Sequence, residues 1–355
     1  MALDDVAREH YAAQQTLARR ASAAAVALWA LLDPAGLAAS WAAQRLGERL
    51  FVLLSSGQAA AAGQAPRYVA RALGAQGASS DPTGELVPNA YAGVASDGRD
   101  LETLVEQPLI RVLTALKQGV PLDRALGMGR SSLETIAETQ IADAGRAAEQ
   151  VAMVVEPRVS GWVRMLVPPS CGRCAVLAGK RFKWNEGFER HPLCDCRHVP
   201  AVEDIADDLR TDPAAYFRSL SREDQNKYFT VAGAEAIRLG ADIAQVVNAR
   251  RGASGLSQPG RLTEAEQRAL RGGRGVGRLQ RVDVYGRQLA TTTEGTTVRG
   301  VAGKRLAAAG GTTRTAGARL RSAKTPRLMP DAILELAAGD REEAQRLLRR
   351  FGYIR

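Results

Sequence analysis

The spacing of apolar side chains predicts that the first part of the chain is helical. Between residues 3 and 75, apolar positions recur every three to four residues, as on the buried face of a helix. We expect a new helix at Asp33 and Pro34, because an Asp N-cap followed by Pro at the first helical position is a common helix start. We interpret Trp29 and Trp41 as core residues packed between these helices.

Two further stretches have the helical period before residue 160. One carries an apolar stripe made of Leu109, Val112, Leu113 and Leu116. The other is expected to begin at Ser131, where Ser131 and Glu134 have the spacing of a capping box, and to run to Val151. Residues 78–98, rich in Gly, Pro, Ser and Asp, have no sustained period and predict a linker.

The pattern changes after residue 160. Residues 161–167 form a short apolar run typical of a strand. Helix signals return after Pro200, with N-caps expected at Asp212 and Ser221 and a break at Gly240. Near the end of the chain, Asp340 begins a capping box in front of a final amphipathic helix.

These patterns predict a mainly α protein with a small β-containing zinc module, an α+β arrangement, in which a flexible basic segment precedes a C-terminal helix. The expected regions are an N-terminal helical region (1–77), a linker (78–98), a helical body (99–165), a zinc-binding module (166–205), a helical unit (206–251), a basic Gly/Arg-rich flexible arm (252–330) and a C-terminal amphipathic helix (331–355). The chain has no run of about 20 apolar residues, so we expect a soluble protein without a membrane partner.

Reactive side chains are concentrated between residues 171 and 198. This stretch contains all four cysteines and two of the three histidines of the chain. Cys171 and Cys174 form a CxxC pair, a spacing at which one tight turn directs two sulfurs at one ion, and thiolates and imidazoles are the ligands that zinc prefers. We therefore expect a structural zinc ion. Its expected ligands are Cys171, Cys174, Cys194 and Cys196, with His191 and then His198 as the alternatives.

The residues between the two halves of this stretch suggest how the halves meet. Phe182, Trp184 and Phe188 flank a turn at residues 185–187, which predicts a strand, a turn and a second strand. Their rings would keep water from the metal. The alternative is that the cysteines are small core residues or form disulfides. Residues 1–20 lack the pattern of a secretory signal, which favours metal binding.

The same stretch contains residue types that also occur in active sites. A catalytic zinc would need an open coordination position and a nearby base, and the sequence contains no HExxH motif. The main enzymatic alternative is a zinc-dependent nuclease of the His-Asn-His type that uses His191, Asn185 and His198. We expect a protein that is not an enzyme.

The basic charge of the chain is confined to one segment. Residues 246–330 contain 17 Lys and Arg against four acids, a net charge of +13, so the remainder of a chain with a total of +10 is slightly acidic. Residues 252–325 have one aromatic residue and no long apolar stripe, which predicts a flexible arm that neutralises DNA phosphates without reading sequence. The expected DNA-binding residues are Arg271, Arg274, Arg278, Arg281, Lys304, Arg305, Arg319 and Arg321. The alternatives are a solubilising tail and an arm that docks on an acidic protein.

These motifs resemble those of a known family. The pattern Cys171-x-x-Cys174-x-x-Leu-x-Gly, followed by Phe188-x-Arg-His-Pro-x-Cys194-x-Cys196, resembles the signature of the phage Mu F-type minor head proteins in their actinobacteriophage form. Residues 240–252 and 347–354 are similar to that form as well, and the likeness covers about residues 100–355. Simpler members of the family lack the first CxxC pair, which leaves the choice of ligands open.

The resemblance implies a minor capsid protein, present in few copies, that acts in head morphogenesis. Its implied partners are the portal, the scaffold or major capsid protein, and packaged DNA. Its implied location is the capsid interior of the virion, after assembly in the host cytoplasm. The alternatives from other classes are the nuclease described above and a sequence-specific DNA-binding regulator.

Overall fold

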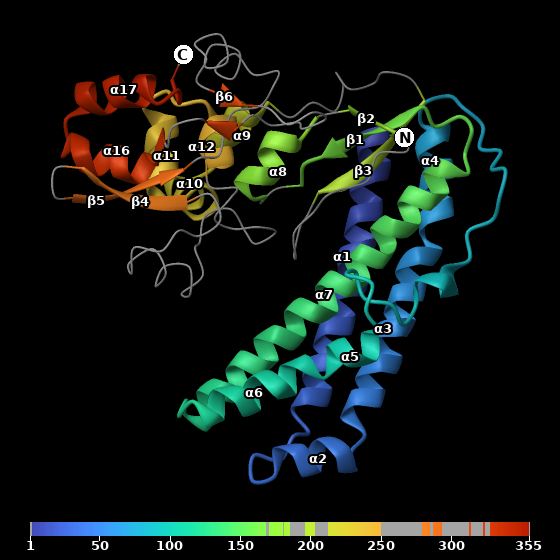
Figure 1. Cartoon of the computed structure of the whole chain (residues 1–355). Helices are drawn as coiled ribbons and strands as arrows, with labels where there is room; N and C mark the ends of the chain where they lie inside the picture. The colour runs from blue at the N-terminus through green and yellow to red at the C-terminus, as the bar shows by residue number, and fades with distance from the viewer. Residues whose placement is uncertain are drawn as a thin grey trace. The chain divides into compact units, whose positions relative to one another are not determined.

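Figure 1 shows a computed structural model of the chain. The described ranges are 2–167, 170–179, 181–184, 196–202, 212–249, 279–284, 287–292, 312–313, 322–323 and 327–354. The chain divides into two compact units, unit 1 (Met1–Met165 and Gly179–Arg210) and unit 2 (Leu166–Ala178 and Thr211–Arg355). The described residues are mainly helical, as the sequence predicts.

Unit 1 is a bundle of helices organised along one long helix. Its helices are α1 (Leu3–Trp29), α2 (Leu37–Ala43), α3 (Leu46–Gly63), α4 (Ala65–Gly74), the 3₁₀ helix η1 (Pro88–Tyr91), α5 (Leu101–Val105), α6 (Gln107–Lys117) and α7 (Leu122–Val154). α1, α3, α4 and α6 all pack against α7. Trp29 and Trp41 are buried and meet edge to face with ring centroids 6.3 Å apart, which confirms their core role.

Two expected helix starts in unit 1 are wrong. α2 begins at Leu37, because the carboxylate of Asp33 instead accepts the N–H of Ala35 in a turn (2.9 Å). α7 begins at Leu122, so Ser131 lies in its interior and caps nothing. The capping-box spacing was misleading there, because the buried stripe of α7 continues on both sides of Ser131.

Close helix packing around α7 depends on a glycine. A Cβ at Gly129 would lie 2.5 Å from a methyl group of Val112 on α6 and 2.6 Å from the ring of Trp29 on α1. Since such distances are shorter than any van der Waals contact, only a glycine lets both helices approach α7 at this level.

A small antiparallel sheet completes unit 1. Its strands are β1 (Gly161–Met165), β2 (Arg181–Lys183) and β3 (Arg197–Ala201), in the order β2-β1-β3. Trp162 lies opposite Phe182 on one side and Pro200 on the other. Every residue of β1 and β3 is buried, and β3 packs against α1, α4 and α7. The expected strand near residues 161–167 is thus confirmed.

Unit 2 combines short helices with short strands. Its helices are α8 (Gly172–Leu177), α9 (Pro213–Ser219), α10 (Arg222–Phe229), α11 (Val231–Arg238), α12 (Ile243–Ala249), α16 (Pro330–Ala337) and α17 (Arg341–Arg350). Asp212 and Ser221 cap α9 and α10 through their side chains, as predicted. Gly240, with a φ of 102°, separates α11 from α12.

Part of the expected flexible arm is a sheet. β4 (Leu279–Val284) and β5 (Arg287–Thr292) form an antiparallel pair, and β8 (Arg327–Leu328) pairs with β5. Two-residue strands β6 (Thr312–Thr313) and β7 (Ser322–Ala323) form a second pair. Leu289 belongs to the core of unit 2, so the prediction of a wholly flexible arm is wrong for these strands. A short hairpin can bury one apolar side chain although its sequence has no long apolar stripe.

The expected single C-terminal helix is two helices. Ala338 and Gly339 take left-handed conformations, with φ values of 47° and 90°, and end α16. Asp340 then caps α17 through the N–H groups of Glu342 and Glu343, which confirms the predicted cap. The apolar face of α17, including Leu347 and Leu348, packs into the core of unit 2. In the described part of the chain, every helix is too short or too polar to cross a membrane.

Candidate functional site

Unit 1 buries a group of ionisable side chains where α1, α4 and α7 meet β3. Glu149 of α7 lies at its centre and is fully buried. The Nε2 atom of His10 on α1 is 2.8 Å from one carboxylate oxygen, and the Nδ1 atom of His198 on β3 is 3.2 Å from the other. A carboxylate only accepts hydrogen bonds, so each facing ring nitrogen carries the donated proton. We call this group the Glu149 cluster.

Tyr68 of α4 connects the two histidines a second time. Its ring stacks on His10 with centroids 3.9 Å apart and planes 5° from parallel. Its hydroxyl donates to the backbone carbonyl of His198 at 2.6 Å. α4 is therefore tied to both α1 and β3 through one buried side chain.

Arg146 lies one turn before Glu149 and ties α7 to the start of β3. Its Nη1 atom is 2.9 Å from the carboxylate of Asp143, and its Nε donates to the carbonyl of Cys196 at 3.3 Å. All three residues are buried. Charge-assisted bonds of this kind are stronger than neutral ones when water is excluded.

α1 and α7 also meet at a second glycine. A Cβ at Gly145 would lie 2.5 Å from the side-chain oxygen of Gln14, which follows His10 by one turn of α1. The amide nitrogen of Gln14 donates to the carbonyl of Ala61 on α3 at 2.9 Å. Gly145 thus leaves room for the buried amide of Gln14 beside the backbone of α7.

Aromatic rings cover the cluster on the side of the sheet. Trp162 of β1 meets the ring of His198 edge-on with centroids 4.6 Å apart, and it stacks on Phe182 of β2 at 4.2 Å. Trp162 is fully buried. These rings exclude water from His198 and lower the local dielectric constant, which strengthens the polar contacts of the cluster.

The surroundings shift the pKa values of three cluster residues. Burial alone would raise the pKa of Glu149, but the hydrogen bonds from His10 and His198 and the positive charge of Arg197 outweigh it and hold that pKa far below its ordinary value. Burial lowers the pKa of His198 despite its bond to Glu149. Burial and the charge of Glu149 raise the pKa of Tyr68. At neutral pH the cluster therefore holds an ionised carboxylate beside a neutral His198 and a neutral phenol.

This arrangement is suited to cohesion. Glu149 and His198 are 0% exposed and His10 is 8% exposed, and each uses a polar atom to join two secondary-structure elements. The cluster links the N-terminal helix, the long helix α7 and the last strand of the sheet. Chemically, the arrangement stabilises the buried negative charge of Glu149 with a hydrogen-bond donor at each carboxylate oxygen.

The first half of the predicted zinc site lies in unit 2. Cys171 is the N-cap of α8, and its sulfur accepts the backbone N–H of Cys174 at 3.4 Å. An N–H donor stabilises the thiolate that zinc requires. Tyr216 of α9 bonds both backbone groups of Ser170 beside this turn, and burial raises its pKa to about 12.

The second half of the predicted zinc site is described only in part. Cys196 and His198 belong to unit 1, Cys196 is buried, and the Nδ1 atom of His198 faces Glu149. Cys194 and His191 lie outside the described residues. The expected module 166–205 is thus divided between the two units. Within the described ranges, no three His, Cys, Asp or Glu side chains are grouped as metal ligands, and the zinc site stays a prediction.

Of the predicted DNA-binding residues, the structure describes only Arg281, which belongs to β4. The other seven lie outside the described ranges, namely Arg271, Arg274, Arg278, Lys304, Arg305, Arg319 and Arg321. Their role stays a prediction.

The sequence contains one signal for the Glu149 cluster, on α1. His10 and Gln14 occupy two positions in the buried stripe of α1, which otherwise consists largely of alanine. A polar residue on an apolar face predicts a buried partner. The partner, Glu149, is likewise on a stripe of α7 that contains Ala148 and Ala152.

The fold and the site together define a mainly α protein whose N-terminal helix is joined to a small antiparallel sheet by a buried carboxylate. No protein-family model matches the chain, and neither a curated protein nor a solved structure matches it. A more particular identity is therefore proposed from the sequence motifs and the geometry described above.

Proposed function

We propose that the chain is a minor capsid protein of a phage, which acts in head morphogenesis and associates with the portal and packaged DNA. The likeness of the Cys171–Cys196 motif to phage minor head proteins supports this proposal. The observation that carries it is the environment of His198 and Cys196. The strand that directly follows the motif, β3, contributes His198 to the Glu149 cluster, in which this histidine is buried against a carboxylate. A structural role for the motif suits a component of an assembly.

A zinc ion would add to this cohesion. Cys171 and Cys174 fit one half of a tetrahedral site, because the N-cap geometry of α8 already provides an N–H donor to the first sulfur. The remaining ligands are proposed to be Cys194 and Cys196, with His191 or His198 as substitutes. Bound zinc would supply a cross-link between sequence segments, as structural zinc does in small modules.

Mass spectrometry of purified phage particles tests the proposed location. The chain should be recovered from the particles in few copies, and it should co-purify with the portal protein when the two are expressed together. A chain that is absent from particles and does not bind the portal would contradict the proposal.

The proposed contact with DNA needs a test that leaves the core intact. Because Leu289 is part of the core of unit 2, deletion of the whole basic segment would also remove packing. We propose instead the triple variant Arg271→Gln, Arg274→Gln and Arg278→Gln, which should weaken salt-sensitive DNA binding and lower the slope of log K against log salt by about 3. The matched control removes three exposed arginines from α17 (Arg341, Arg349 and Arg350), and it should leave binding unchanged. Equal effects of the two variants would place the contact elsewhere.

The nuclease alternative makes the opposite prediction. The purified chain incubated with plasmid DNA and Mg²⁺ or Zn²⁺ should leave the plasmid intact. Metal-dependent cutting that is lost in a His191→Ala variant would replace the structural proposal with the enzymatic one. A sequence-specific footprint would support a regulator.

A further inference from the structure

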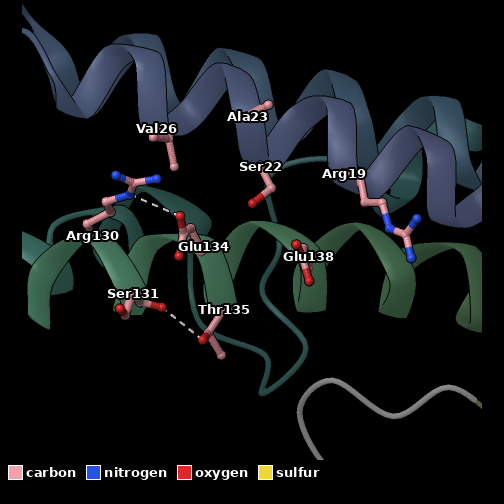
Figure 2. A pocket seen from close by; sticks show the side chains of 9 residues that line it. All are labelled: Arg19, Ser22, Ala23, Val26, Arg130, Ser131, Glu134, Thr135 and Glu138. Atoms are coloured by element: carbon pink, nitrogen blue, oxygen red, sulfur yellow. Dashed lines mark hydrogen bonds and ion pairs between the residues drawn. The ribbon is translucent and has the colours of Figure 1, made fainter. Parts of the chain in front are cut away.

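One face of α7 runs along four turns of the helix. Its residues are Arg124, Gly127, Ser131, Thr135 and Glu138, which follow one another at intervals of three or four and therefore share one side of the helix. The first three are exposed, and Thr135 and Glu138 are half-buried. A shallow groove of about 620 Å³ separates this face from α1, and another of about 670 Å³ separates it from α6. Figure 2 shows the first groove, with Ser131, Thr135 and Glu138 of α7 on one side and residues of α1 on the other. We call this surface the α7 face.

The α7 face carries opposite charges at its two ends. Arg124 lies at one end and Glu138 at the other, and within the described part of the chain neither has an ion-pair partner. The neighbouring acid Glu134 differs, because it is paired with Arg130 at 3.1 Å (Figure 2). Arg19 of α1 lines the same groove as Glu138 (Figure 2), but no ion pair joins them within the described residues, so both Arg124 and Glu138 can still pair with charges outside the chain.

The α7 face has little side-chain bulk at Gly127, one turn before Ser131. No atom lies within 4 Å of the place where a Cβ of Gly127 would stand. The internal packing of the chain therefore does not require a glycine there, although glycine lowers helix stability relative to alanine. At Gly129, two residues further on, internal packing does require one. A glycine in open space on a helix allows another backbone to approach closely.

We propose that a second copy of this chain packs across the α7 face, with the two α7 helices antiparallel and a two-fold axis passing beside Ser131. In such a pair, position 131 + n of one copy faces position 131 − n of the other. Arg124 then faces Glu138 of the second copy, and the reverse contact forms at the other end. Gly127 faces Thr135 in the same way.

The charge pattern favours a second copy over an unrelated partner. Arg124 and Glu138 are about 21 Å apart along the helix, given the rise of 1.5 Å per residue. An unrelated helix would need the same two charges at the same spacing in reverse order, whereas a second copy carries them already. A parallel pair would bring arginine onto arginine, so the charges also select the antiparallel arrangement. A two-fold contact of this kind closes as a dimer. It involves unit 1 alone and does not depend on the proposed function.

Charge reversal tests the pairing directly, with the full-length chain in sedimentation equilibrium. The native chain should dimerise, and Arg124→Glu or Glu138→Arg should each raise the dimer dissociation constant by about tenfold, because each variant creates two like-charge contacts. An equimolar mixture of the two variants should recover dimers, because every cross-contact is then between opposite charges. The double variant Arg124→Glu with Glu138→Arg should recover them as well.

A second test changes the shape of the α7 face without changing its charge. Gly127→Leu fills the open space that faces Thr135 of the second copy and should abolish the dimer while leaving the circular dichroism spectrum unchanged. The matched control is Gly74→Leu on α4, where a Cβ also meets nothing within 4 Å, and it should dimerise like the native chain. A native chain that is monomeric at every concentration overturns the proposal. So does a dimer that both single reversals leave unchanged, or one that the mixture and the double variant fail to recover.

Discussion

Burial of a carboxylate costs free energy unless nearby donors offset the lost hydration, and Glu149 has an imidazole donor on each of its two oxygens. The two histidines depend on the carboxylate in turn, because each would otherwise direct an N–H into a dry environment. The three side chains therefore stabilise unit 1 only as a set. Removal of Glu149 takes the acceptor from both facing ring nitrogens, and removal of either histidine takes the donor from one carboxylate oxygen.

This mutual dependence predicts a large effect of Glu149→Leu. The variant should lower the free energy of unfolding by about 3–5 kcal/mol, because it leaves two buried donors unsatisfied. Glu134→Gln is the matched control on the same helix, and since its ion pair with Arg130 is exposed it should cost at most about 1 kcal/mol. Urea unfolding followed by far-ultraviolet circular dichroism measures both. Equal midpoints for the two variants would show that the cluster does not support the fold.

The pKa shifts of the cluster predict loss of stability in acid. Below about pH 6.5 an unfolded histidine takes up a proton, whereas the lowered pKa of His198 keeps it neutral in the fold, so acid favours unfolding. Below about pH 4.3 the same holds for Glu149, whose pKa is also lowered in the fold. The stabilising contributions are thus present above these values and decrease as the pH falls. The thermal unfolding midpoint should fall as the pH is lowered from 8 to 4. Between pH 7 and 5 it should fall less in the His198→Gln variant than in the native chain. The same dependence of the midpoint on pH in both proteins would contradict a role of His198 in this loss.

Little of the Glu149 cluster could be predicted from the sequence. The position of His198 within the Cys/His stretch made metal binding the natural hypothesis for its side chain. Its contact with Glu149 requires β3 to pair with β1 and to pack on α7, and these contacts join residues far apart in the chain. The spacing of residues along a sequence predicts local geometry, but it does not predict which distant segments pair with each other.

At the scale of single elements, caps and glycines decide where helices end and how closely they pack. The predicted caps at Asp212, Ser221 and Asp340 are confirmed, because each side chain bonds a backbone N–H two or three residues ahead. The expected start at Ser131 is wrong, since a long helix with a continuous buried stripe needs no cap in its middle. Local capping chemistry therefore predicts a helix start only where the stripe also begins.

Two glycines of α7 allow the effect of packing on stability to be distinguished from the effect of helix propensity. Gly129→Ala should lower the free energy of unfolding by about 1–3 kcal/mol, because the added methyl group would overlap Val112 and Trp29. Gly127→Ala should raise it by about 0.5–1 kcal/mol, since alanine favours the helix and the space is open. Thermal unfolding of the two variants at low protein concentration, where association does not contribute, gives the comparison. Shifts of the same sign would contradict the described packing.

The cap of α17 provides a test in unit 2. Asp340→Ala should cost about 1 kcal/mol, because the N–H groups of Glu342 and Glu343 lose their acceptor. Asp340→Asn keeps an equally good cap and serves as the control. Chemical denaturation monitored through the fluorescence or circular dichroism of the chain should separate the two; an equally large loss in the Asn variant would mean that charge, and not capping, is responsible.

For the whole molecule, the sequence predicts the class of the fold but not its division into units. Helical periodicity identified a mainly α chain because long amphipathic stretches are the strongest local signal. The Cys/His stretch looked like one module because its residues are adjacent in sequence. The structure assigns residues 166–178 to unit 2 and residues 179–210 to unit 1, a division that depends on packing with distant segments.

A structural zinc ion would be detectable in the metal content and the thermal stability of the whole protein. Metal analysis of the purified chain should give about one zinc per chain, and Cys171→Ser should lower both the zinc content and the thermal midpoint. Ser170→Ala, next to the first ligand, is the control for local disturbance and should retain the metal. A metal-free chain with unchanged stability would refute the zinc prediction.

The assignment of residues 166–178 to unit 2 means that the backbone passes between the units three times, at 165/166, 178/179 and 210/211. During synthesis, α8 of unit 2 therefore emerges before β2 and β3 of unit 1. A nascent chain that ends at residue 165 contains His10 and Glu149 but has no His198 to complete the cluster. Unit 1 cannot reach its final fold until residue 198 has left the ribosome. A single proteolytic cut at one passage would leave two covalent connections between the units.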